Sequence, residues 1–109
     1  MTNCCPKPIP IILDTDIGND IDDTWALGML LNSPEFELKL VLTSTGDARY
    51  RARVAAGFLE ACGRDDIPVG IGVSRADGSP ETMHEYADSY QLEQYSGGIW
   101  EDGVGRALE

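Results

Sequence analysis

The chain has 109 residues, and its 8 Lys+Arg stand against 19 Asp+Glu, which gives a formal net charge of −11. Hydrophobic residues make up 42% of the sequence and charged residues 25%, a composition that indicates a globular domain and excludes a disordered tail. The acidic balance argues against nucleic acid and against an anionic membrane surface as partners, because both attract clustered Lys and Arg. We therefore expect metal cations or neutral small molecules as ligands.

The beginning of the chain and its cysteines indicate where the protein works. No stretch approaches the roughly 20 apolar residues of a membrane span, and the first residues lack the pattern of a signal peptide. Residues 1–8 are polar with two prolines, which predicts a flexible leader before a domain over residues 9–109. Cys4, Cys5 and Cys62 make a poor disulfide framework. They favour a reduced protein in the cytoplasm.

Apolar runs alternate with stretches of helical periodicity in the first part of the chain. In chain order, the sequence predicts a strand at 9–13, a helix at 22–32, a strand at 36–43, a helix at 48–62 and a strand at 67–73. The first run is continuously apolar, as in a strand buried on both faces, and Pro10 should delay its first pairing. This β-α-β-α-β order predicts an α/β fold, an open parallel sheet with flanking helices of the Rossmann-like type.

The pattern weakens after Ser74. Residues 81–95 indicate a loop or an irregular helix, residues 97–105 are rich in glycine, and residues 106–109 resemble the beginning of a helix. A sheet of three strands would leave an open edge and an uncovered face. We therefore expect either a homo-oligomer or the remainder of a longer chain as a partner.

The sequence also predicts which of several other side chains are buried and which are exposed. Trp25 is expected in the core, Cys62 is expected to be buried, and His84 is expected in a solvated loop. The arginines of the second predicted helix should face solvent and pair with nearby acids; they are Arg49, Arg51 and Arg53.

Five aspartates lie within the ten residues from Asp14 to Asp23, at the carboxyl end of the first predicted strand. Ligands of open α/β sheets bind at this edge, and crowded carboxylates repel one another unless a cation lies among them. Aspartate oxygens suit hard cations such as Ca²⁺ or Mg²⁺. Gly18 allows a sharp turn that would bring the later aspartates back toward the earlier ones. Capping of a helix explains one or two of the later aspartates, but it does not explain Asp14 and Asp16.

Two other motifs share features with this segment. An EF-hand loop beginning at Asp14 would need Gly and Glu where Asn19 and Trp25 stand. Asp14-x-Asp16 after an apolar strand is similar to the opening of Mg²⁺-dependent phosphatases of the haloacid dehalogenase type, in which Asp14 would be the nucleophile. Those enzymes have Thr or Val where Gly18 stands. The phosphatase is kept as an alternative, beside a catalytically silent module that binds metal or assembles with itself.

Asp14-x-Asp16-x-Gly18 followed by Asp22-Asp23-x-x-Ala26-Leu27 resembles the N-terminal signature of the inosine-uridine-preferring nucleoside hydrolase family. Two later segments resemble turns of the same family; they are Thr45-Gly46-Asp47 and Asp102-Gly103-Val104-Gly105. The resemblance covers most of residues 9–108 and only the N-terminal portion of such an enzyme. The sequence departs from the family pattern at three places: an apparent insertion Asn19-Asp20, Asp47 in place of Asn, and Ile99-Trp100 in place of His-Gly.

The resemblance implies an enzyme that hydrolyses the N-glycosidic bond of purine or pyrimidine nucleosides, giving base and ribose, with Ca²⁺ favoured over Mg²⁺ as cofactor. It implies that Asp16 and Asp23 are metal ligands and that Asp16 is also the general base. Asp22 would hold the ribose hydroxyls in catalysis, with Asp20 as a rival for that role, and Asp14 would brace the cluster. Because family members take further ligands from their C-terminal portion, the isolated chain should have little or no activity.

Two candidate substrate-binding residues lie outside the cluster. Asp47 follows the second predicted strand, so it should lie at the same edge of the sheet and reach the sugar, or else cap the next helix. Trp100 lies in a glycine-rich loop, where its ring could stack on the base or anchor the loop.

Overall fold

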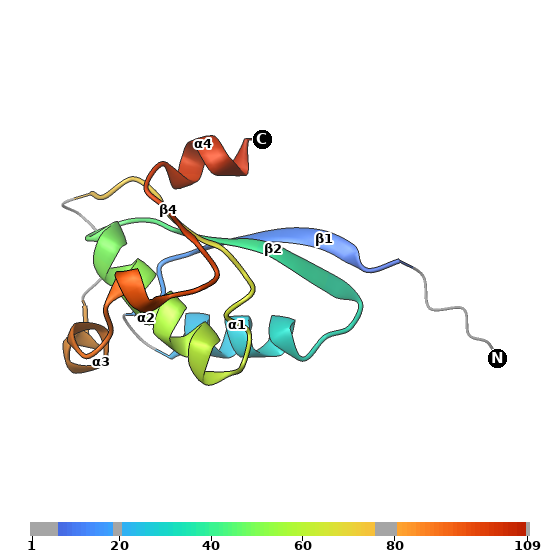
Figure 1. The fold of residues 1–109 in the computed structure, drawn as a ribbon, viewed down its shortest axis with the longest axis horizontal. Coiled ribbons are helices and arrows are strands. Elements are labelled where there is room, and N and C mark those ends of the chain that lie inside the picture. The colour runs from blue at the N-terminus through green and yellow to red at the C-terminus, as the bar shows by residue number, and fades with distance from the viewer. Residues whose placement is uncertain (1–6, 19–20, 76–80, 109) are drawn as a thin grey trace.

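The computed structural model describes residues 7–18, 21–75 and 81–108, and it confirms the predicted α/β architecture. Four parallel strands form one sheet in the order β1-β2-β3-β4 (Figure 1). The strands are β1 (Ile9–Thr15), β2 (Phe36–Thr43), β3 (Val69–Ile71) and β4 (Ile99–Trp100). The helices are α1 (Asp22–Leu31), α2 (Ala48–Ala61), α3 (His84–Asp88) and α4 (Gly103–Ala107), with a 3₁₀ turn η1 at Leu92–Gln94.

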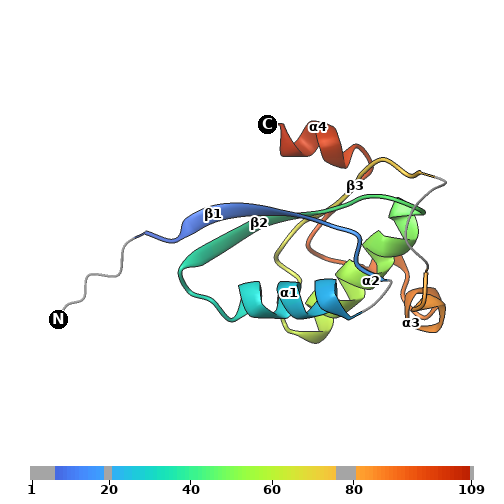
Figure 2. The same ribbon diagram turned by 180° about the vertical axis from the view of Figure 1, so that it is seen from behind.

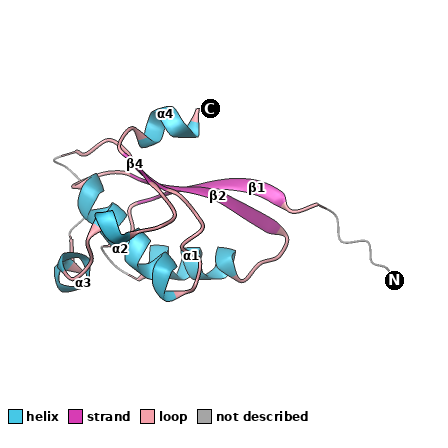
Figure 3. Ribbon diagram, viewed as in Figure 1, coloured by secondary structure: helices cyan, strands magenta, loops and turns pink. Residues whose placement is uncertain are grey.

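The sheet separates two unequal layers of helices. Helices α1, α2 and α3 lie on one side and α4 lies on the other, as the two opposite views show (Figures 1 and 2). The strands follow one another in chain order, so right-handed crossovers that step in one direction place their helices on the same face. Figure 3 shows this arrangement with helices and strands in separate colours. Most of the core lies between the sheet and α2, where Val41, Val54, Leu59 and Val69 are fully or almost fully buried.

The strand β1 lies at an edge of the described sheet, so the prediction that it is buried on both faces is wrong. Ile9 and Ile12 are 57% and 47% exposed. Pairing also begins earlier than predicted, because the N–H of Ile9 donates to the carbonyl of Glu35 at 2.8 Å. Consecutive N–H groups of a strand point to opposite sides. The N–H of Ile9 points toward β2, so an N–H at Pro10 would point to the open side of this edge strand, and its absence costs no pairing. A continuous apolar run does not distinguish an edge strand from a central one.

The strand β4 was not predicted. It has two residues, it lies in the glycine-rich segment, and Val69↔Ile99 and Gly70↔Trp100 are its pairs with β3. A strand this short carries no periodicity. It follows α3 and η1, which lie in the stretch predicted as a loop or an irregular helix.

Helix α4 packs against β3 on the second face of the sheet, and glycine residues form the contact. A Cβ atom added at Gly70 would lie 2.8 Å from the Cα of Gly103, and one added at Gly103 would lie 2.6 Å from Cδ1 of Leu42. The two backbones therefore touch only because neither residue has a side chain. Leu40 is 4% exposed beside this contact, so α4 buries part of β2 as well.

Two further side-chain predictions are wrong. Trp25 is 65% exposed, whereas Leu27 of the same helix is fully buried. Cys62 is exposed, because α2 ends at Ala61 and Cys62 follows the last turn. In the described part of the chain, no helix has the length and apolar character needed to cross a bilayer.

Candidate functional site

The carboxyl ends of β1 and β2 meet at one edge of the sheet. Thr15 pairs with Thr43 at the end of both strands, and the N–H of Ser44 donates to the carbonyl of Thr15 at 3.1 Å. The acidic segment after β1 therefore begins next to the segment that leads from β2 into α2. This is the edge at which parallel α/β sheets bind ligands.

Asp16 and Asp23, the predicted metal ligands, are brought together. Oδ2 of Asp23 accepts a hydrogen bond from the Thr15 hydroxyl at 2.5 Å and another from the N–H of Asp16 at 3.0 Å. Burial raises the pKa of Asp23, but hydrogen bonds from Asp16 and Thr15 and the charge of Arg51 outweigh it and hold the pKa below its ordinary value. Asp23 is therefore a carboxylate at neutral pH.

The sharp turn at Gly18 is present. Gly18 has a φ of 113°, and a Cβ atom there would lie 2.8 Å from Cε2 of Tyr50. The Tyr50 hydroxyl donates to the carbonyl of Gly18 at 2.5 Å and accepts from the N–H of Met83 at 2.8 Å. The N–H of Thr82 donates to the same carbonyl at 2.9 Å. The turn after β1 is thus fixed by α2 and by the segment before α3.

Arg51 lies beneath this turn, and the prediction that it faces solvent is wrong. It is fully buried, and its Nε donates to the carbonyl of Thr45 at 2.9 Å. Its Nη1 donates to the carbonyls of Asp16 at 2.8 Å and Ile17 at 3.1 Å. Buried carbonyls need donors, and a guanidinium supplies several at once. The signal for its burial was helical spacing, since Arg51 lies one turn before Ala55 on the predicted apolar face.

The other two arginines of α2 are closer to the prediction. Arg49 forms an ion pair with Glu101, and both side chains are largely exposed. Arg53 lies 3.9 Å from Asp88, with 28% of its side chain exposed. These pairs connect α2 to the residue that follows β4 and to α3, and such surface pairs contribute little stability.

The remaining aspartates of the cluster are dispersed. Asp14 is exposed, and its Oδ1 accepts from the Ser44 hydroxyl at 2.8 Å. Asp22 is exposed in the first turn of α1, where no side chain caps the helix and Ile21 occupies the capping position. Asp20 lies outside the described residues. The structure therefore joins Asp16 to Asp23 and leaves the contacts proposed for Asp14, Asp20 and Asp22 as predictions.

Asp47 caps α2. Its Oδ1 accepts from the N–H groups of Arg49 at 3.1 Å and Tyr50 at 3.2 Å, and its own N–H donates to Oε2 of Glu81 at 3.2 Å. The capping alternative is thus correct, and a contact with sugar stays a prediction.

Trp100 is 42% exposed at the end of β4. The guanidinium of Arg106 lies 4.3 Å from the centre of its ring. One face of the ring is therefore engaged by a cation from α4, and stacking of a base on this ring stays a prediction.

The site offers part of the oxygen ligands that a divalent cation needs. Among the described residues, no three His, Cys, Asp or Glu side chains gather closely enough to hold a metal. Asp16 and Asp23 supply carboxylates of the kind that hard cations prefer, but Ca²⁺ takes about six to eight oxygens. The pair fits one side of a calcium site, and the other ligands would have to be further protein groups, water or substrate.

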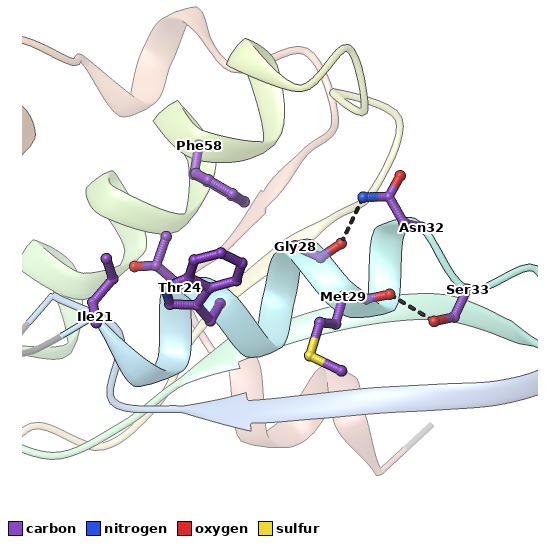
Figure 4. A pocket seen from close by; sticks show the side chains of 8 residues that line it. Ile21, Thr24, Gly28, Met29, Asn32, Ser33 and Phe58 are labelled. Carbon is purple, nitrogen blue, oxygen red and sulfur yellow. Dashed lines mark hydrogen bonds between the residues drawn. The ribbon is translucent and has the colours of Figure 1, made fainter.

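A separate groove lies along α1 (Figure 4). Its volume is about 510 Å³, and the residues that line it carry no charge; they are Ile21, Thr24, Trp25, Gly28, Met29, Asn32, Ser33 and Phe58. Two of its polar side chains bond back to α1, because Asn32 donates to the carbonyl of Gly28 and Ser33 to that of Met29. The groove offers apolar contact and no group for acid–base chemistry.

Comparison with known proteins identifies the family. The model of the inosine-uridine preferring nucleoside hydrolase family matches residues 11–100. The chain belongs to this family. The match confirms the resemblance seen in the sequence, and it covers most of β1 and all of β2, β3 and β4.

Two relatives of the nucleoside hydrolase family are similar over somewhat more than half of the chain. One is the probable uridine nucleosidase 2 of Arabidopsis thaliana, 42% identical over 67 residues, which are 60% of this chain and 20% of that protein. Another is the pyrimidine-specific ribonucleoside hydrolase RihA of Photobacterium profundum, 42% identical over 65 residues, which are 58% of this chain and 20% of that protein. The similarity thus spans about a fifth of the length of these relatives. No solved structure matches the chain.

Proposed function

We propose that this chain is the metal- and ribose-binding N-terminal part of a nucleoside hydrolase that uses Ca²⁺. The reaction is hydrolysis of the N-glycosidic bond of a purine or pyrimidine ribonucleoside to a free base and ribose. The observation that supports this most is the family match over residues 11–100, which includes Asp16 and Asp23, and the main-chain N–H of Asp16 donates to the carboxylate of Asp23. Because both relatives are named for uridine or pyrimidine nucleosides, uridine is the first substrate to test.

In this proposal Asp16 and Asp23 hold the cation, for which Mg²⁺ is the weaker candidate. Bound Ca²⁺ would supply a Lewis acid that lowers the pKa of a water molecule. Asp16 accepts the proton of the attacking water as general base. Positive charge develops on the sugar as the glycosidic bond breaks, and nearby carboxylates stabilise it. Asp22 binds the ribose hydroxyls, with Asp20 as the alternative.

Three other residues support this arrangement in the proposal. Asp14, which bonds to Ser44, braces the acidic segment against the end of β2. Asp47 reaches the sugar with the carboxylate oxygen that does not accept from Arg49 and Tyr50. Trp100 contacts the base through the ring face that Arg106 leaves open.

Calorimetric titration with Ca²⁺ tests the metal site. We expect Asp16→Asn and Asp23→Asn each to weaken Ca²⁺ binding about 10- to 100-fold, because each removes a charged ligand. Asp88→Asn is the matched control, since the Asp88 side chain is largely exposed and its ion pair with Arg53 is long, at 3.9 Å. Unchanged affinity in both site variants, relative to this control, would refute the proposed ligands.

The isolated chain should turn over nucleosides slowly or not at all, because no three His, Cys, Asp or Glu side chains of the described residues gather into a metal site. A reducing-sugar assay with uridine and inosine measures this, and rapid turnover by the isolated chain would contradict it. Release of phosphate from a phosphomonoester without nucleoside cleavage would favour the phosphatase alternative with Asp14 as nucleophile. Ca²⁺ binding without any turnover would favour the silent module.

The proposal also includes a partner and a location. The partner that completes the site in this proposal is either a second copy of the chain or the remainder of a longer chain, and light scattering on the purified protein distinguishes a homo-oligomer from a monomer. A cytoplasmic location agrees with Cys62, which is free and exposed. Fractionation of cells that express the protein tests the location.

A further inference from the structure

Large apolar side chains border the groove along α1 and are left uncovered by the fold. Ile21, Trp25 and Met29 are 63%, 65% and 65% exposed. They follow one another at intervals of four residues, so they form one ridge along the surface of the helix. Phe58 points toward this helix from α2 and lines the same groove (Figure 4). An exposed apolar ridge of this kind is typical of a surface that contacts another molecule.

A row of smaller side chains runs beside the ridge. Thr24, Gly28 and Asn32 also recur at intervals of four residues and line the groove. Packing within the chain does not require glycine here, since a Cβ atom at Gly28 would come no closer than 3.8 Å to Phe58. Glycine inside a helix costs about 1 kcal/mol relative to alanine, and no contact within the described chain offsets this cost. Gly28 therefore forms a notch that suits a side chain of another molecule.

The polar side chains of the groove can be covered without loss. Asn32 donates to the carbonyl of Gly28 at 3.3 Å, and Ser33 donates to the carbonyl of Met29 at 2.7 Å. Because these groups already have partners within α1, an apolar side chain that covers them leaves no donor unsatisfied.

The ridge and the row are complementary to each other when two copies of α1 lie antiparallel. In the register that centres on the notch, every large side chain of one copy faces a smaller one of the other; the opposed pairs are Trp25 with Gly28, Ile21 with Asn32, and Met29 with Thr24. Packing of such rows into one another is the commonest type of helix contact. An interface between two identical chains must be complementary to itself, and this surface meets that condition.

The charges of the chain favour the same partner and the same orientation. Two copies with a net charge of −11 repel each other, and the residues that line the groove carry no charge. The first turn of α1 carries Asp22 and Asp23, and its last turn has no basic residue. Parallel helices would bring four carboxylates together. Antiparallel helices place each acidic turn beside the uncharged last turn of the other copy.

We propose that two copies of this chain associate through antiparallel α1 helices, with Trp25 of each copy in the Gly28 notch of the other. The eight residues of the groove are fewer than the roughly 20–30 residues per side of a stable complex. The dimer is therefore weak, with a dissociation constant of about 10 µM to 1 mM. This inference does not depend on the proposed function, because the aspartates of the acidic cluster do not line the groove.

Sedimentation equilibrium of the full chain, from about 10 µM to 1 mM, tests the association. We expect the mass of the wild type to rise with concentration from that of one chain toward that of two. Trp25→Ala removes the central side chain and Gly28→Leu fills the notch, so each should weaken the dimer about 10-fold or more. Ala26→Leu is the matched control, because it adds the same side chain at an exposed position of α1 outside the groove. Far-UV circular dichroism verifies that each variant is folded.

An equimolar mixture of Trp25→Ala and Gly28→Leu tests the register. In a mixed dimer, the leucine introduced at position 28 of one copy faces the space that Trp25→Ala leaves in the other. The second contact keeps the native pair of Trp25 and Gly28. We therefore expect the mixture to dimerise more strongly than either variant alone.

Each contrary outcome overturns a definite part of the proposal. A wild type that stays monomeric up to about 1 mM would overturn a second copy as the occupant and assign the groove to a different partner. A dimer that Trp25→Ala and Gly28→Leu leave unchanged would overturn this face as the interface. A mixture that associates no better than its components would overturn the antiparallel register. None of these results bears on Ca²⁺ binding or nucleoside turnover, so the hydrolase proposal is tested separately.

Discussion

Two neighbouring residues of α2 hold the main chain of the candidate site, although they are not part of its acidic cluster. Tyr50 and Arg51 are both fully buried, and between them they donate to the main-chain carbonyls of Asp16, Ile17 and Gly18. A buried carbonyl without a donor costs about 1–3 kcal/mol, so these contacts determine the path of the turn after β1. The orientation of Asp16 depends on side chains that are more than thirty residues away in the sequence.

Replacement of the Tyr50 hydroxyl tests this dependence. Tyr50→Phe keeps the ring in place but leaves the N–H of Met83 without its acceptor and takes one of three donors from the carbonyl of Gly18. We expect a loss of about 1–3 kcal/mol in the free energy of unfolding, measured by urea denaturation. We also expect weaker Ca²⁺ binding in the calorimeter.

Tyr86→Phe is the control, because Tyr86 is 37% exposed and should change stability by less than about 0.5 kcal/mol. Equal stability of Tyr50→Phe and wild type would show that the hydroxyl does not hold the turn.

The orientation of α1 could not be predicted at the scale of single elements. The helix carries Trp25, Leu27, Met29, Leu30 and Leu31, so apolar residues surround it and no stripe indicates the buried face. The structure buries Leu27, while Trp25 and Met29 are each 65% exposed and line the groove between α1 and Phe58. The direction of the helix axis against the sheet, rather than hydrophobicity, decided which side chains were covered.

A pair of alanine substitutions in α1 measures this difference. Leu27→Ala should lower the free energy of unfolding by about 2–5 kcal/mol, because it leaves a cavity in the core. Trp25→Ala should lower it by less than about 1 kcal/mol, although tryptophan is the larger side chain. Both values come from the same denaturation experiment, and a larger loss for Trp25→Ala would contradict the orientation of α1.

At the scale of the whole molecule, the two faces of the sheet are covered to different degrees. Helices α1, α2 and α3 shield one face, and α4 shields the other face beside β3 (Figure 2). The outer part of β1 stays open, as the exposure of Ile9 and Ile12 shows. The sequence predicted such an uncovered face, and α4 reduces it without closing it.

The contact between α4 and β3 depends on two glycines and can be tested. Gly103→Ala places a methyl group 2.6 Å from Leu42 and 2.7 Å from the carbonyl carbon of Gly70, so we expect a loss of about 1–3 kcal/mol in the free energy of unfolding. Gly28→Ala is the matched control, because its nearest contact would be 3.8 Å from Phe58 and the helix gains propensity. That variant should be more stable than wild type by up to about 1 kcal/mol. Similar stability of both variants would contradict the close crossing.

The sequence by itself determined the order of strands and helices, the parallel sheet, the family and the segment that carries the acidic site. These features depend on local periodicity, turn residues and motif spacing, which act between neighbours in the chain. The bounds of β2 and the end of α2 before Gly63 follow from the same local signals.

Only the tertiary structure decided which of these residues meet. It joined Asp16 to Asp23, assigned Asp47 to the cap of α2, buried Arg51 beneath the turn, and paired His84 with Glu81. The physical reason is that each of these contacts depends on distances across the sheet and between helices. Such distances follow from packing and from the need of buried polar groups for partners, and neither is encoded in the spacing of a single segment.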